Sequence, residues 1–94
     1  DELQYFNGKD ETCSLKVQTA EIISLEILKW DAGEFTWLQS SENEKGKVSY
    51  LLQVSKPDSV YSVYDGNRML TVKSDKNGVL KFEVKTGVKT ISVR

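Results

Sequence analysis

The last third of the chain, residues 59–94, alternates apolar and polar residues between short polar breaks. The breaks contain Asp65-Gly66, Asn77-Gly78 and Thr86-Gly87. Such dipeptides close tight hairpin turns, because glycine adopts a positive φ without a Cβ clash. A period of two is the pattern of a strand with one buried face, whereas a helix places apolar residues three and four positions apart. This region therefore predicts consecutive β-hairpins.

The rest of the chain follows the same rhythm. All six glycines lie in polar breaks, the one proline, Pro57, lies in a loop, and no segment has helical spacing over three turns. The expected strands are residues 13–18, 22–30, 34–40, 47–54, 59–64, 68–74, 79–85 and 90–94. Short strands at this spacing predict an all-β fold, an antiparallel sandwich of about 7–8 strands that is immunoglobulin-like or fibronectin-like. We expect residues 1–11 to be a leader or linker and residues 12–94 to form a single β-sandwich domain.

Size and charge narrow the classes of function. A chain of 94 residues supports one hydrophobic core. Lys and Arg number 13 against 14 Asp and Glu, a net charge of −1 with both signs mixed along the chain, which disfavours a nucleic-acid partner. No apolar run approaches the ~20 residues of a membrane helix, so no membrane insertion is expected. The single cysteine, Cys13, has no second cysteine with which to form an internal disulfide.

The chain has few residues suited to catalysis. It contains no histidine, which removes imidazole bases and the common zinc sites. The acidic residues lie at outward strand positions or in turns, where a solvated surface is the simpler interpretation. We therefore expect a protein that is not an enzyme and needs no cofactor. Asp75 and Asn77 are weak candidates for a structural calcium site, but Asp and Asn also brace ordinary turns.

Alternation assigns the apolar strand residues to a common buried face. The predicted inward residues are Val48, Tyr50, Leu52, Val54, Tyr61, Val63, Leu70, Val72, Leu80, Phe82, Val84, Ile91 and Val93. The two tryptophans depend on the hairpin at residues 31–33. A three-residue loop there pairs Trp30 with Glu34 and Ile27 with Trp37, which buries Trp37 and leaves Trp30 on the outer face. A register shift of one residue exchanges the two faces.

Exposed aromatic residues are the remaining candidates for recognition, because sugar rings stack their C–H faces on Trp and Tyr. Trp30, with Glu26 and Thr36 nearby, is one candidate group. Tyr64, which shares its outward face with Met69, is the other. We predict Trp30, Glu26, Thr36 and Tyr64 as ligand-binding residues. The alternative is that Trp30 and Tyr64 cover the edge of the sandwich or dock onto a neighbouring domain.

Residues 60–72 and 75–82 resemble a pattern found in small β-sandwich modules at the C-terminal end of secreted bacterial glycoside hydrolases and polysaccharide lyases. There, a strand ending Y-x-V-y-x-D-G leads into a second strand, an acidic NG or DG turn, and G-x-L-x-F, closed by a strand like residues 90–93. The resemblance covers roughly residues 47–94. It implies a non-catalytic accessory domain of an exported, extracellular or cell-surface enzyme, whose signal sequence is expected to be absent from this fragment. Its expected partners are a neighbouring domain of the parent protein and, through weak binding, a polysaccharide.

Two functions of different class remain. One is an accessory module that binds glycan weakly or supports its catalytic domain. The other is an immunoglobulin-like interaction or adhesion module of a surface protein, which meets another protein through an edge strand or hairpin tips. The positions of Trp30 and Tyr64 separate them. Placement on one exposed face favours glycan binding, and placement on opposite sides favours a structural or protein-contact role.

Overall fold

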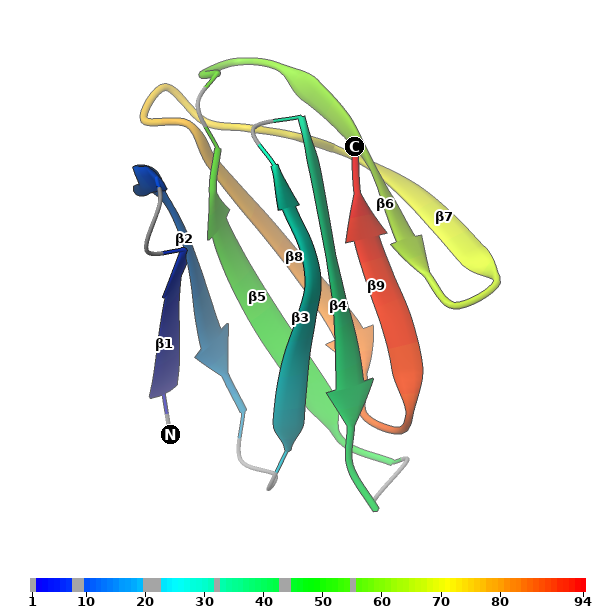
Figure 1. The fold of residues 1–94 in the computed structure, drawn as a ribbon. Helices are drawn as coiled ribbons and strands as arrows, with labels where there is room; N and C mark the ends of the chain where they lie inside the picture. Colours follow the sequence, from blue (N-terminus) through cyan, green and yellow to red (C-terminus); the bar gives the residue numbers. More distant parts are fainter. Residues whose placement is uncertain (1, 8–9, 20–22, 32, 43–44, 55) are drawn as a thin grey trace.

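The computed structural model describes residues 2–7, 10–19, 23–31, 33–42, 45–54 and 56–94, with side chains from residue 15 onward. Within these ranges the chain is all-β, and nine strands form two antiparallel sheets that face each other (Figure 1). The expected antiparallel β-sandwich is confirmed. The strands are β1 (Glu2–Asn7), β2 (Asp10–Gln18), β3 (Ser24–Asp31), β4 (Glu34–Ser40), β5 (Lys47–Gln53), β6 (Val60–Asp65), β7 (Arg68–Lys73), β8 (Val79–Lys85) and β9 (Lys89–Val93).

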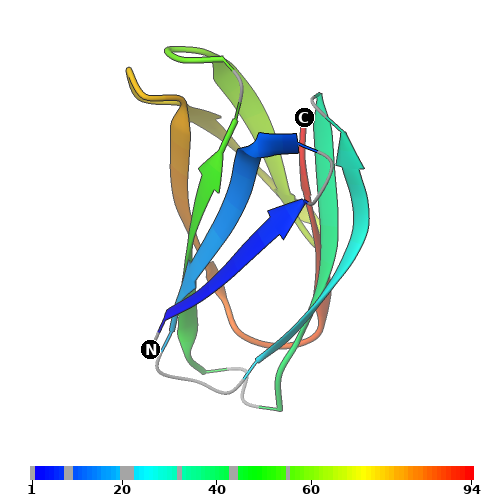
Figure 2. The same cartoon turned by 60° about the vertical axis from the view of Figure 1, so that its left-hand side comes forward.

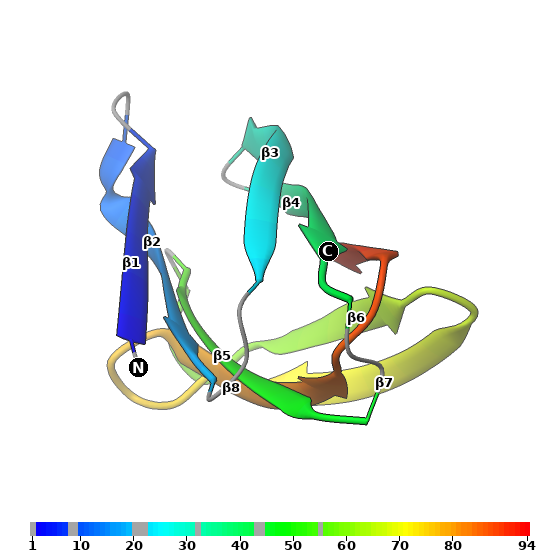
Figure 3. The same cartoon turned by 90° about the horizontal axis from the view of Figure 1, so that it is seen from below.

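The two sheets divide the strands in a way that alternation alone does not determine. One sheet has the order β1-β2-β5-β8 and the other β3-β4-β9-β6-β7, and Figure 3 shows them from below. Only β6–β7 in the last third is a hairpin within one sheet, since the chain crosses between the sheets from β7 to β8 and again from β8 to β9. The prediction of consecutive hairpins there is therefore wrong. A period of two identifies the buried face of a strand but not the sheet that the strand joins.

Residues 2–7, expected to belong to a leader, instead form the edge strand β1. It pairs antiparallel with β2 from Glu2↔Gln18 to Asn7↔Asp10, and the register shifts between Phe6 and Asn7. Figure 2 shows this hairpin in front of the sandwich. The start of β2 is likewise earlier than the predicted residue 13. The leader predicted over residues 1–11 is therefore wrong for residues 2–7, 10 and 11, which belong to the four-stranded sheet, and residues 1, 8 and 9 lie outside the described residues.

The core lies between the two sheets and matches most of the predicted inward set. Its buried apolar side chains are Leu15, Val17, Phe35, Trp37, Val48, Tyr50, Leu52, Val54, Tyr61, Val63, Leu80, Phe82, Val84, Ile91 and Val93. At its centre Trp37 lies 5.1 Å from Tyr50 and 6.3 Å from Phe82, measured between ring centroids. Leu70 and Val72 also face the core, but they are only partly buried because β7 is a sheet edge.

Two turn glycines provide a matched test of backbone geometry. Gly78 has φ +77°, and a Cβ there would lie 2.7 Å from the carbonyl oxygen of Val54. Gly66 has φ +60° with open space around it. We expect Gly66→Ala to lower the free energy of unfolding by about 1–2 kcal/mol, which is the cost of holding a residue with a Cβ in the left-handed backbone conformation. Gly78→Ala should cost roughly 2–4 kcal/mol, because backbone crowding adds to the same penalty. Urea denaturation of both variants checks this, and equal losses would contradict the predicted crowding.

Candidate interaction surface

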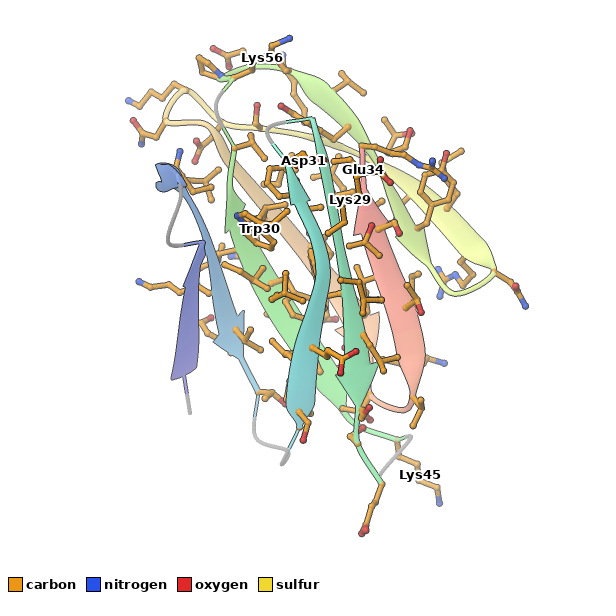
Figure 4. The ribbon with its side chains drawn as sticks, in the orientation of Figure 1. Lys29, Trp30, Asp31, Glu34, Lys45 and Lys56 are labelled. Carbon is orange, nitrogen blue, oxygen red and sulfur yellow. The ribbon has the colours of Figure 1, made fainter. Side chains whose placement is uncertain are left out.

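Trp30 points into the sandwich rather than away from it. It pairs with Phe35, not with Glu34 as predicted, because the register shifts between Ile27 and Lys29 and leaves Leu28 as an extra residue on β3. The ring of Trp30 meets that of Phe35 edge-on at 4.9 Å and lies 6.3 Å from that of Trp37. Figure 4 shows Trp30 on the side of β3 that faces β5. The predicted outer-face position of Trp30 is therefore wrong, while the predicted burial of Trp37 is confirmed.

A simple energy comparison explains the bulge at Leu28. Without it, Trp30 would turn to solvent, and Lys29 would turn toward the core. Burying a large apolar side chain is worth roughly 1.5–3 kcal/mol, whereas one ladder hydrogen bond contributes only about 0.5–1.5 kcal/mol net. The bulge leaves Leu28 exposed at 52 % and puts Lys29 outside, 3.0 Å from Glu34. Tertiary packing thus overrides regular pairing on this strand.

Five side chains lie in one row across the outer face of the five-stranded sheet. Adjacent members face each other across neighbouring strands, and we call this set the outer-face row: Lys29, Thr36, Ser92, Tyr64 and Met69. Four steps of about 4.8 Å between strands give it a length of roughly 19 Å. The hydroxyls of Thr36 and Ser92 are hydrogen-bonded at 3.2 Å. The row forms a continuous surface that combines hydroxyl, aromatic, thioether and cationic groups.

Tyr64 is the aromatic centre of this row. The guanidinium carbon of Arg94 lies 4.7 Å from its ring centroid, a cation–π contact that occupies one face of the ring. Tyr64 pairs with Met69, which is 57 % exposed, so the predicted shared face of these two residues is confirmed. The turn that follows is one residue later than expected, because Asp65 belongs to β6 and pairs with Arg68.

The predicted ligand-binding residues are divided between two surfaces. Thr36 and Tyr64 belong to the outer-face row, and Glu26 lies on the same face, one row away, where it pairs with Leu38. Trp30 lies on the opposite side of the sheet. The two rings on which a stacking site would depend are thus separated by the sheet itself.

A buried polar cluster, which was not predicted, fixes the crossing from β8 to β9. The hydroxyl of Tyr50 donates to Oε1 of Gln39 at 2.7 Å. Nε2 of Gln39 donates to the carbonyl oxygens of Lys85 and Gly87 at 3.0 and 3.1 Å. Burial raises the pKa of the Tyr50 phenol, which keeps it protonated as a donor. Gln39 lies two residues after Trp37 and four after Phe35, so the alternation along β4 places it inward with them. This alternation was the signal available in the sequence.

Asp65 and Lys89 form a second polar contact at the end of the core. Asp65 is 7 % exposed, and its Oδ1 lies 2.9 Å from Nζ of Lys89. Asp65 continues the inward alternation of Tyr61 and Val63, so its position in the strand again indicates that it is buried. The ammonium of Lys89 compensates the buried carboxylate, and the contact joins the β6–β7 hairpin to the start of β9. Its position and partners suit a structural role.

The weak metal candidates are engaged in a turn. Oδ1 of Asp75 accepts hydrogen bonds from the backbone N–H groups of Asn77 at 2.8 Å and Val79 at 3.0 Å. These bonds are those of a side chain that braces its own turn. Among the residues described, no group of three or more potential metal-binding side chains comes together.

No helix in the described part of the chain is long and apolar enough to cross a membrane. In the comparisons with known proteins, no family model, no curated protein and no solved structure matches this chain.

Proposed function

We propose that this protein is a non-catalytic β-sandwich module that docks onto another protein surface through the outer face of its five-stranded sheet. In the setting that the sequence resemblance implies, that surface belongs to a neighbouring domain of an exported carbohydrate-active protein. The observation that carries the proposal is the separation of Trp30 from Tyr64 by the sheet.

The contrast between the two outer faces supports this choice. The outer-face row contains Tyr64 and Met69 beside Arg94, and aromatic residues, Met and Arg are enriched in protein interfaces. The outer face of the four-stranded sheet instead presents charged side chains. Lys47 and Glu83 lie there 3.7 Å apart, and both are well exposed. Lys and Glu are depleted from interface cores, so the five-stranded sheet is the better docking face.

Glycan stacking is less well supported than protein contact. Sugar-binding surfaces combine aromatic rings whose flat faces are open to the ligand. Tyr64 is the single aromatic residue that the described strands place on this outer face, and Arg94 covers one side of its ring. A protein partner makes better use of the mixture, since Tyr and Arg often dominate binding energy at the centre of an interface.

Photocrosslinking in the cells that produce the protein tests the proposal. A benzophenone side chain at Thr36, which lies in the row next to the central Ser92, should form an adduct with one defined protein or with the neighbouring domain. The same group at Lys81, on the opposite sheet, should give none and serves as the matched control.

A polysaccharide screen provides the opposing outcome. The domain should migrate unretarded through gels that contain soluble polysaccharides. Retardation that Tyr64→Ala abolishes would overturn the proposal in favour of glycan binding. Equal adducts from Thr36 and Lys81, or adducts from neither, would also overturn it.

A further inference from the structure

The edge strand β7 presents unused backbone hydrogen-bonding groups. Ser62 on β6 exchanges both of its backbone hydrogen bonds with Arg94, at 2.8 and 3.0 Å. Successive residues of a strand direct these groups to opposite sides, so Tyr61 and Val63 direct theirs to β7. Their partners there are Val72 and Leu70.

The alternate residues of β7, Met69, Thr71 and Lys73, therefore direct their N–H and C=O groups away from the sheet. The described residues provide no hydrogen-bond partner for these groups. The pairing of β6 with β7 is regular throughout, from Val60↔Lys73 to Asp65↔Arg68. Three ladder positions in succession are thus open on an unbulged strand, which is the backbone arrangement that accepts an added strand.

The other edges of the two sheets are less suitable. β3 carries the bulge at Leu28, a device that disrupts edge pairing. The free edge of β8 has occupied hydrogen-bonding groups at both of its ends. The carbonyl oxygen of Val79 accepts from the N–H of Asp75, and the carbonyl oxygen of Lys85 accepts from Nε2 of Gln39. β1 has a register shift between Phe6 and Asn7.

The side chains of β7 define the chemistry of a partner. Arg68 and Lys73 stand at its two ends and are exposed, and residues 66–74 contain no acidic residue. Leu70 and Val72 face the core but remain partly exposed at the edge. A matching strand would carry acidic residues for charge complementarity and alternating apolar residues to cover Leu70 and Val72.

We propose that β7 binds an extended acidic segment of a partner protein, which joins the five-stranded sheet as a sixth strand. This site shares Met69 with the outer-face row but uses the backbone edge of β7 rather than the outer side chains, so either site can fail without the other.

Amide exchange of the free chain provides the first test. The N–H groups of Met69, Thr71 and Lys73 should exchange quickly, and those of Leu70 and Val72 slowly. The reverse pattern would overturn the assignment of the free edge.

Selection from a displayed library of random dodecapeptides provides the second test. Enriched peptides should be acidic with alternating apolar residues, and their binding should slow exchange at Met69, Thr71 and Lys73. Thr71→Pro removes an outward N–H, which edge strands tolerate, and should weaken binding roughly tenfold or more. Thr71→Ala keeps the N–H and should bind normally.

The paired charge reversals Arg68→Glu and Lys73→Glu alter no backbone group and cover the case in which Thr71→Pro fails to fold. They should also weaken binding of the acidic peptides roughly tenfold. Absence of any enriched peptide, enrichment of basic peptides, or binding that these reversals leave unchanged would overturn the proposal. Loss of peptide binding on Thr36→Arg alone would assign the peptides to the outer-face row and would also overturn it.

Discussion

Replacing Trp37 with alanine is expected to lower the free energy of unfolding by roughly 3–5 kcal/mol. The indole is fully buried and packs between the rings of Trp30, Tyr50 and Phe82. Its removal leaves a cavity that two facing sheets cannot close without disturbing their strand pairing. A domain of this size has a total stability of about 5–14 kcal/mol, so the variant should lie close to the unfolding threshold.

Urea denaturation followed by far-ultraviolet circular dichroism measures this effect. Leu28→Ala is the matched control, because Leu28 is 52 % exposed at the bulge and its truncation should change stability by only about 0.5 kcal/mol. A loss at Trp37 no larger than the loss at Leu28 would contradict the position of Trp37 at the centre of the core.

Replacing Gln39 with leucine is expected to destabilise the protein by roughly 2–4 kcal/mol. The substitution conserves size but leaves the Tyr50 hydroxyl and the carbonyl oxygens of Lys85 and Gly87 without their partner. Each buried polar group left unsatisfied costs about 1–3 kcal/mol, reduced where water reaches it. The crossing from β8 to β9 should loosen first, because both backbone carbonyl oxygens that Gln39 holds belong to it.

A double-mutant cycle with Tyr50→Phe isolates the central hydrogen bond. Tyr50→Phe alone should cost about 1–2 kcal/mol by leaving Oε1 of Gln39 without its donor. The double variant has neither the Tyr50 hydroxyl nor its acceptor on Gln39, so neither group is left without a partner. Its loss of stability should therefore be smaller than the sum of the losses of the two single variants. Additive losses would show that the two side chains do not act as a unit.

Alternation and turn residues were sufficient to predict the class of fold and most of the core. Val63, Leu80 and Ile91 lie where alternation places them, because their strands pair without a bulge. The edge strand β1 was missed although Asn7-Gly8 is a strong hairpin signal. The assignment of strands to sheets was not accessible, since it depends on which strands meet across the core.

The candidate site was harder to predict than the fold. The outward position of Tyr64 follows from its alternation with the inward residues Tyr61 and Val63, although the turn after it lies one residue later than predicted. The position of Trp30 does not follow in this way, because the bulge at Leu28 is the outcome of a competition between ladder hydrogen bonds and burial of an indole. The alternation of apolar and polar residues along one strand does not reveal which of these two energies is larger. Gln39 and Asp65 were not predicted, although both are polar residues at positions where the strand alternation points inward.

The position of Trp30 is the point on which the functional account depends most. Nuclear Overhauser contacts measured in solution test it directly. We predict contacts from the indole protons of Trp30 to the rings of Phe35 and Trp37 and none to the side chain of Thr36. Contacts between Trp30 and Thr36, without contacts to Phe35, would place the indole on the outer face with Tyr64. That result would contradict the account and restore the case for a glycan-stacking surface.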